Sequence, residues 1–500
     1  MRYYSTRDKT ISVNASKAIL KGLAPDGGLF VPAESPELYL SQGLPGNSYQ
    51  AIAAEIFSRF LGDYSPSEIE QAINSAYNPD TFDHPDVTPL NGLSDHLYIM
   101  ELWHGPTSAF KDIALQVLPH LLTTASQKSG DGREIVILTA TSGDTGKSAL
   151  EGFRDVPGVK IIVYFPEKGV SEIQKLQMTT QEGDNVGVIA VRGNFDDTQA
   201  AVKHIFSDRK INRYLEEAGF RLSSANSINW GRLLPQVSYY FSAYRELTYR
   251  GKLKKGEPVN FVVPTGNFGN ILAGYYARRL GLPVNRLVCA ANRNNVLSDF
   301  INSGVYDKRR TFYNSLSPSM DILISSNLER LLFELTGHDS ERIRGWMDQL
   351  NQNGHYSVNQ ETLCTLQELF WSDYASDEET LEAIARTYRD YKYLIDPHTA
   401  VGIHVLDKYR EQENDRHISV VLSTASPYKF TGSTIRALFN SSRFKGKSEL
   451  ELIKILAQET GAPVPENLAD LEQKPVLHRQ VIDPADMPAH LQKILIDKQL

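Results

Sequence analysis

The stretch that decides the fold is EIVILTA at 134–140, followed by TSGDTGKSAL at 141–150 and VKIIVYF at 159–165. The first and last segments are apolar along their whole length and have the length of a strand. The segment between them is a glycine turn that leads into a short helix, expected from Lys147 to Arg154. Strands without polar alternation are typical of a parallel sheet covered by helices on both faces. The stretch therefore predicts an α/β fold.

The same alternation of strands and helices continues along the chain. Further strands are expected at 186–191, 260–263, 287–291 and 418–423, with helices at 171–182 and 195–208. We expect two lobes with mostly parallel sheets flanked by helices, and helical additions at both ends. A segment rich in proline and aspartate, 79–90, indicates the first boundary. The expected domains are 1–95 (N-terminal domain), 96–225 (first α/β lobe), 226–445 (second α/β lobe with a helical insertion) and 446–500 (C-terminal helical extension).

The composition excludes several classes of protein. The 500 residues include 52 Lys and Arg against 60 Asp and Glu, a net charge of −8, so binding to nucleic acid is not expected. Two cysteines form neither a disulfide framework nor a zinc cluster, which fits a reducing compartment. The first residues lack the apolar core of a signal peptide, and no run approaches the roughly 18 apolar residues of a membrane span. We expect a cytoplasmic globular protein without membrane contact.

The turn TSGDTGKS (141–148) ends like a nucleotide-binding P-loop. That pattern needs a glycine five residues before Gly146, and Thr141 stands there, which disfavours a nucleoside triphosphatase. The hydroxyls of Ser142 and Thr145 and the backbone N–H groups at the start of the helix can still form an anion site. For the turn taken alone, capping of the helix is the simpler explanation.

A second glycine turn, VPTGNFGN (263–270), also lies between a strand and a helix. Gly266 and Gly269 let the backbone turn sharply and present several N–H groups to one phosphate. The Gly-x-Gly of dinucleotide-binding folds is missing, and such turns also occur without a ligand.

The segment WHGPTSAFKD (103–112) delivers Lys111 to the first turn of an apolar helix. A cationic lysine is unfavourable there, because the helix dipole favours anions. A neutral lysine in a pocket would act as a nucleophile toward a carbonyl cofactor, whereas a surface lysine balanced by Asp112 is the simpler alternative. His104 is expected either to orient this loop or to be a packed structural histidine.

The segment STASPYKF (423–430) places hydroxyls at the carboxyl end of the strand 418–423, where ligands of open α/β sheets bind. An ordinary serine–threonine turn is the alternative. The twelve histidines show no metal-ligand spacing, so no metal site is predicted.

Taken together, these segments resemble the threonine synthase family, pyridoxal-phosphate enzymes of the tryptophan-synthase-β fold type (fold type II), in the longer form found in bacteria and fungi. The resemblance covers most of the chain and rests on YSTRD (4–8), GLAPDGGLFVP (22–32), HGPTSAFKD (104–112), TATSGDTGKSAL (139–150), NSINWGR (226–232) and PTGNFGN (264–270). The chain departs from the family in STASPYKF, where Ser426 stands in place of a histidine.

The resemblance implies the roles of individual residues. Lys111 would bind pyridoxal phosphate covalently and later move protons. The cofactor phosphate would be held by Gly266, Asn267, Phe268, Gly269 and Asn270, and the pyridine nitrogen by Thr424. The phosphate of the substrate, O-phospho-L-homoserine, would be bound by Ser142, Asp144, Thr145 and Arg232, and guanidinium suits that task because it binds phosphate bidentately.

The implied reaction is γ-elimination of phosphate followed by β-addition of water, which gives L-threonine in the last step of threonine biosynthesis. Three alternatives stay open: a phospho-lyase on the same scaffold that gives 2-oxobutyrate, a P-loop-like nucleoside triphosphatase or switch, and a catalytically silent relative that binds the cofactor. We expect a monomer or a homodimer that acts on a small molecule.

Overall fold

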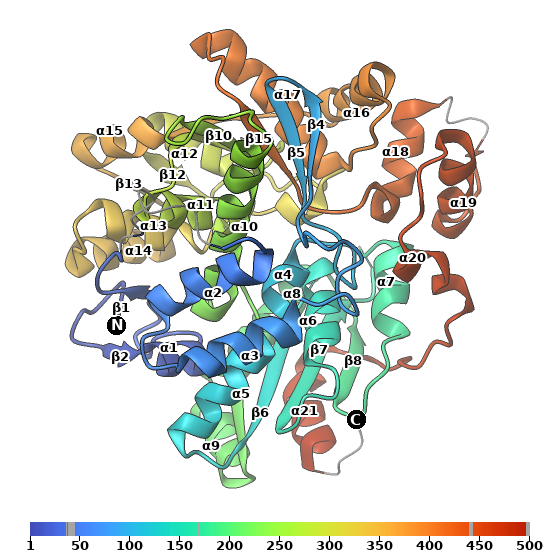
Figure 1. The fold of residues 1–500 in the computed structure, drawn as a ribbon. Coiled ribbons are helices and arrows are strands. Elements are labelled where there is room, and N and C mark those ends of the chain that lie inside the picture. The colour runs from blue at the N-terminus through green and yellow to red at the C-terminus, as the bar shows by residue number, and fades with distance from the viewer. Residues whose placement is uncertain (37, 39–45, 142, 169, 440–443, 497–500) are drawn as a thin grey trace.

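A computed structural model describes residues 1–36, 38, 46–141, 143–168, 170–439 and 444–496. In this part of the chain two large sheets lie in separate halves, with the short helix α4 (Lys111–Leu115) between them (Figure 1). The architecture is the expected α/β fold of two lobes with mostly parallel sheets and additions at both ends.

The first large sheet is parallel throughout and has the strand order β16-β8-β7-β6-β9. Its strands are β6 (Glu134–Ala140), β7 (Val159–Pro166), β8 (Val186–Val191), β9 (Phe220–Ser223) and β16 (Val481–Ile482). The strands β6, β7 and β8 are apolar because helices cover both faces. The helices of this lobe are α5 (Leu118–Ser129), α6 (Asp144–Phe153), α7 (Glu172–Thr179), α8 (Phe195–Ser207) and α9 (Arg209–Glu217).

The second large sheet has the strand order β14-β11-β10-β15-β5-β4 and is parallel except for the hairpin of β4 and β5. Its strands are β4 (Leu90–Ser94), β5 (Leu97–Glu101), β10 (Val259–Pro264), β11 (Val284–Ala291), β14 (Phe370–Tyr374) and β15 (Ser419–Ser423). Helix α17 (Pro397–Glu413) packs on one face, while α10 (Trp230–Tyr249) and α11 (Gly269–Arg279) pack on the other.

Two strands lie in a different sheet from the one that the sequence indicates. Strand β5 falls in the segment 96–225, expected to form the first lobe, yet it pairs with β15 of the second sheet in the register Ser419↔Leu97 to Ser423↔Glu101. Strand β16, in the expected helical extension 446–500, joins β8 of the first sheet. Apolar patterning predicts that a strand is buried but not which sheet it joins, because pairing depends on tertiary packing.

The N-terminal region contains a small antiparallel sheet of β1 (Arg2–Ser5), β2 (Ser12–Asn14) and β3 (Phe30–Pro32), together with α1 (Ala15–Lys21), α2 (Tyr49–Phe60) and α3 (Pro66–Ala76). It packs on α10, where Trp230 contacts Tyr3 edge to face at 5.4 Å between ring centroids. The hydrophobic core therefore continues from this region into both lobes.

The remaining elements cover the sheets and the ends of the chain. They are α12 (Val296–Ser303), β12 (Val305–Asp307), η2 (Pro318–Met320), α13 (Leu328–Leu335), α14 (Ser340–Asn353), β13 (His355–Ser357), α15 (Gln360–Leu369), α16 (Asp377–Tyr391), η3 (Pro427–Phe430), α18 (Thr431–Leu438), α19 (Glu449–Thr460), α20 (Glu466–Ala469), η5 (Leu471–Gln473), η6 (Pro484–Asp486) and α21 (Met487–Ile496). No helix in the described ranges is long and apolar enough to cross a membrane.

Candidate active site

A cavity of about 2350 Å³ lies between the lobes, at the carboxyl ends of strands from both large sheets. Four chain segments that follow such strands reach it: the segment after β5, the turn between β6 and α6, the turn between β10 and α11, and the segment after β15. The cavity brings together ten of the candidate residues, namely Lys111, Asp144, Thr145, Arg232, Gly266, Asn267, Phe268, Gly269, Asn270 and Thr424. The remaining one, Ser142, lies outside the described residues.

Lys111 is the first residue of α4 and is 9% exposed. The alternative in which Asp112 balances it does not hold, because the Asp112 carboxylate accepts hydrogen bonds from the backbone N–H of Thr107 at 2.8 Å and from its hydroxyl at 2.6 Å. The lysine segment is tied to the segment after β15 by a bond from the N–H of Phe110 to the carbonyl of Thr424 at 2.9 Å. This bond fixes the residue before Lys111 to the segment that carries Thr424.

The surroundings of Lys111 lower the pKa of its amine. Burial lowers the pKa of its amine, the positive charges of Arg232 and Lys429 lower it further, and Asp144 opposes them, so that the pKa is about 8. The Lys111 Nζ lies 3.5 Å from Asp144 Oδ2. With this pKa about a tenth of the amine is uncharged at pH 7, far more than for an ordinary lysine, and that fraction can act as a nucleophile or a base.

Asp144 is the first residue of α6, and its carboxylate forms hydrogen bonds and ion pairs with other side chains. Its Oδ1 lies 2.7 Å from Lys429 Nζ and accepts a bond from Gln174 Nε2 at 2.9 Å, while its Oδ2 accepts a bond from the Ser319 hydroxyl at 3.3 Å. Burial raises the pKa of this carboxyl, but the two lysines outweigh it and hold the pKa well below its usual range. A permanently ionised carboxylate repels phosphate, so only the backbone of Asp144 is suited to bind that group.

The N-terminus of α6 has free donors at this point. The Thr141 hydroxyl oxygen accepts bonds from the N–H groups of Gly143 and Gly146, both at 3.0 Å. The N–H groups of Asp144 and Thr145 have no acceptor among the described residues. The start of α6 therefore presents free N–H donors to the cavity, an arrangement suited to an anion.

Arg232, in the first turn of α10, is 5% exposed and faces the same cavity. Its Nη1 donates to the carbonyl of Ala225 at 2.8 Å, and no carboxylate pairs with it in the part of the chain that the structure describes. Burial lowers the pKa of the guanidinium to about 10. A buried cation without a counter-ion is costly, and an anionic ligand would remove that cost.

The turn before α11 is a second helix start at the cavity that is suited to an anion. Phe268 adopts the left-handed conformation (φ 63°), and no side chain caps the helix. The Asn270 Oδ1 accepts bonds from the hydroxyls of Tyr239 at 2.6 Å and Tyr240 at 3.0 Å, whereas its Nδ2 is buried without a partner in the described ranges. Free N–H groups and an orphaned amide fit a bound phosphate.

Thr424 follows β15 and is 7% exposed at the cavity wall. Its hydroxyl forms no hydrogen bond with another described residue, so it is free to bond a ligand. Ser426 is fully buried and accepts a bond from the backbone N–H of Tyr428 at 3.3 Å. The residue that departs from the family pattern thus caps η3 and does not line the cavity.

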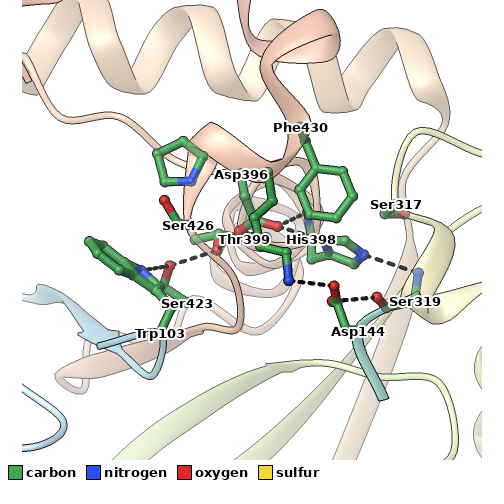
Figure 2. A network of polar contacts seen from close by, with 12 residues as sticks. Trp103, Asp144, Ser317, Ser319, Asp396, His398, Thr399, Ser423, Ser426 and Phe430 are labelled. Atoms are coloured by element: carbon green, nitrogen blue, oxygen red, sulfur yellow. Dashed lines mark hydrogen bonds and ion pairs between the residues drawn. The ribbon is translucent and has the colours of Figure 1, made fainter. Parts of the chain in front are cut away.

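A row of polar contacts continues from the cavity into the second lobe (Figure 2). The backbone N–H of Ser319 donates to His398 Nε2 at 3.2 Å, and His398 Nδ1 lies 2.5 Å from Asp396 Oδ2. Sequence reasoning missed Ser319, His398, Asp396 and also Lys429, although Lys429 lies within the segment 423–430. The signal that could have found Asp396 is its position before Pro397, since Asp is a preferred helix N-cap and proline a preferred first helical residue.

Two other candidates lie outside the cavity wall. Lys147, which a nucleotide-binding loop would place on a phosphate, instead donates to Glu151 Oε2 at 3.0 Å and to Gln181. His104 lies 2.5 Å from Asp83 Oδ1 and 2.7 Å from Glu101 Oε2. Burial lowers the pKa of His104, but these carboxylates raise it to about 9.

Comparisons with known proteins find relatives along most of the chain. Family models described as Threonine synthase N terminus, Pyridoxal-phosphate dependent enzyme, and Threonine synthase, C-terminal match residues 2–77, 76–370 and 399–494. A threonine synthase of Pseudomonas aeruginosa is 42% identical over 87% of this chain and 90% of its own length. The human protein Threonine synthase-like 1 is 40% identical over 85% of this chain and 58% of its own length.

Solved structures of threonine synthases are also similar to this chain. A pyridoxal-phosphate-bound threonine synthase from Brucella melitensis has a TM-score of 0.87 and 36% identity, covering 98% of this chain and 99% of its own. A yeast threonine synthase has a TM-score of 0.87 and 35% identity, covering 99% of this chain and 98% of its own.

Proposed function

Since this chain belongs to the threonine synthase family of pyridoxal-phosphate-dependent enzymes, we propose that it converts O-phospho-L-homoserine and water into L-threonine and phosphate. One observation carries the proposal to the level of residues. Among the described residues, two helix N-termini without a side-chain cap and a buried arginine, Arg232, without a carboxylate partner open onto the cavity that holds Lys111, which matches a reaction with one phosphate on the cofactor and one on the substrate.

The α11 turn and its neighbours fit the cofactor. We assign the cofactor phosphate to the backbone N–H groups from Gly266 to Asn270 and to the orphaned Nδ2 of Asn270. The free hydroxyl of Thr424 suits the ring nitrogen, and the Lys111 amine suits the aldehyde. When bound, pyridoxal phosphate withdraws electrons from the substrate and stabilises negative charge at its α-carbon.

The α6 turn and Arg232 fit the substrate phosphate. The N–H groups of Asp144 and Thr145 and the Arg232 guanidinium converge on the cavity from two elements. Their positive character stabilises a phosphate dianion, and more strongly so as the bond to the leaving group breaks and charge moves onto its oxygen. Ser142 remains a proposed ligand of the same group.

Lys111 is the group placed to move protons. Its uncharged amine, with a pKa of about 8, accepts a proton at Nζ near neutral pH and returns it at a later step. Burial limits the access of water to this amine, which reduces loss of the proton to solvent.

Product analysis tests the proposal. Purified protein and pyridoxal phosphate are incubated with O-phospho-L-homoserine, and phosphate and organic products are quantified together by mass spectrometry. We expect threonine and phosphate in equal amounts, and neither with Lys111→Ala. Phosphate with 2-oxobutyrate would make the protein a phospho-lyase, and no phosphate would contradict the substrate.

The oligomeric state of the protein, its location in the cell and its partners are also proposals. We propose a monomer or homodimer that works in the cytoplasm and does not bind nucleic acid. The net charge of −8 supports the last point, and the two cysteines, Cys289 buried and Cys364 exposed and both free, fit a reducing compartment. Light scattering and fractionation of cells test these statements.

A further inference from the structure

A second buried lysine, which the reaction as proposed does not use, lies behind the cavity wall and contacts Asp144, a residue of that wall. Lys429, in η3, is 0% exposed. Its Nζ donates to the carbonyl of Thr107 at 2.9 Å and lies 2.7 Å from Asp144 Oδ1. Both contacts reach across to other segments, because Thr107 belongs to the Lys111 segment and Asp144 begins a helix of the other lobe.

Asp144 therefore lies between two ammonium groups at unequal distances. Its Oδ1 is 2.7 Å from Lys429, and its Oδ2 is 3.5 Å from Lys111. The carboxylate is also fixed by Gln174 on Oδ1 and by Ser319 on Oδ2. Each oxygen thus faces one of the two lysines, and the closer contact is the one with Lys429.

We propose that Lys429 is a positioning residue: it keeps the Asp144 carboxylate closer to itself than to Lys111 and so keeps more of the Lys111 amine in its uncharged form. This inference rests on the proposed function, in which that amine reacts with the cofactor and moves protons. Lys429 acts on Lys111 in two ways, through its own positive charge and by taking the nearer carboxylate oxygen. Both effects disfavour a second positive charge on Lys111.

Other charged groups also face this pair. Arg232 of α10 adds positive charge near Lys111, and Asp112 of α4 faces Lys429 but is bonded to Thr107. From the second lobe, Asp321 and His398 lie at the cavity wall, and His398 is paired with Asp396. These groups remain in place when Lys429 is changed, so a change at Lys429 isolates its own contribution.

The test measures the Lys111 amine in the protein without cofactor. Trace acetylation with acetic anhydride is followed across the pH range, and the modified Lys111 peptide is quantified by mass spectrometry. The wild type should give a midpoint near pH 8. With Lys429→Met the midpoint should rise by about one pH unit or more, because Lys111 gains the Asp144 carboxylate and loses a repelling charge.

Three further variants make the result decisive. Lys429→Gln keeps an N–H donor for Thr107 without the charge and should give the same rise, which serves if Lys429→Met does not fold. Asp144→Asn should move the midpoint in the opposite direction, below that of the wild type. Lys147→Met, a matched change of another lysine paired with a carboxylate, should leave it unchanged.

An unchanged midpoint in both soluble Lys429 variants would overturn the inference. A fall in both would overturn it as well. Because the labelling needs neither cofactor nor substrate, these outcomes are separate from a failure to form threonine, which would instead contradict the proposed function.

Discussion

The two helix N-termini that open onto the cavity begin alike but are supported differently. Each follows a buried parallel strand, and neither is capped by a side chain. The α11 turn is fixed on several sides: Ser325 donates to the carbonyl of Gly266 at 2.8 Å, Asn327 Nδ2 donates to that of Asn267 at 2.9 Å, and two tyrosines hold Asn270. In the α6 turn the Thr141 hydroxyl oxygen accepts two backbone N–H bonds. The Asp144 carboxylate there forms ion pairs with Lys429 and Lys111.

The difference fits two kinds of phosphate. A turn held by uncharged hydrogen bonds on several sides is preorganised and suits a group that stays bound. A helix start surrounded by charges that can redistribute, with Arg232 opposite, suits a group that arrives, leaves and changes its charge. The comparison thus supports the proposal that the cofactor phosphate binds at α11 and the substrate phosphate at α6.

The largest effect is expected at Lys111, which lines the cavity onto which both turns open. Lys111→Ala should lower kcat by at least about 10³-fold, because it removes both the nucleophile and the proton carrier. Turnover of O-phospho-L-homoserine measures this, with Lys147→Ala as the control that keeps most of the activity. Substantial turnover by the alanine variant would show that another group does the chemistry.

Arg232→Met should sharpen the distinction between the two turns. Loss of a charge-assisted contact of about 1.5–3 kcal/mol should raise the KM for O-phospho-L-homoserine roughly 10- to 100-fold. The affinity for pyridoxal phosphate, measured by absorbance titration, should stay the same. Exposed Arg279, changed to Met, is the matched control. If cofactor affinity falls as far as substrate affinity, the two phosphates do not have separate sites.

Asn270→Asp should give the complementary result. The substitution keeps an oxygen for Tyr239 and Tyr240 but replaces the orphaned Nδ2 by a charge, so cofactor affinity should fall about tenfold or more. Absorbance titration measures the affinity, and thermal unfolding without cofactor checks that the fold is retained. Unaltered cofactor affinity would place its phosphate elsewhere.

The smallest effect is expected at His104, which does not line the cavity. Its pKa is raised to about 9 by Asp83 and Glu101 against the effect of burial, so its charged form stabilises the folded state. That stabilisation is fully present below pH about 6.5 and is lost as the pH rises through 9. His104→Ala should therefore be less stable than the wild type by about 1–3 kcal/mol at pH 6 and by much less at pH 10. Thermal unfolding at both pH values measures this; an equal difference at both would contradict it.

Much of this arrangement could be predicted from the sequence. The apolar segments 134–140 and 159–165 are the strands β6 and β7, and the glycine turns lie where expected. Strong local patterns of this kind are visible because burial on both faces leaves no polar alternation. Spacing along the sequence could not show that the four chain segments meet at one cavity. That expectation came from the resemblance to a family.

The parts that could not be predicted depend on pairing across long distances in the chain. Strand β5 joins the second sheet through β15, more than 300 residues away in the chain. Lys429 and Asp144 come from different lobes, and nothing near either residue in the sequence indicates the other. In a sequence, a buried lysine cannot be distinguished from an exposed lysine until the carboxylate that pairs with it is known.

The assignment of the two phosphates is tested most directly by a crystal structure of Lys111→Ala with pyridoxal phosphate and O-phospho-L-homoserine bound, since this variant should bind both without turnover. The account predicts the cofactor phosphate on the N-terminus of α11, next to Asn270. It predicts the substrate phosphate on the N-terminus of α6, within hydrogen-bonding distance of Arg232. A substrate phosphate away from α6 and Arg232, or a cofactor phosphate there, would contradict it.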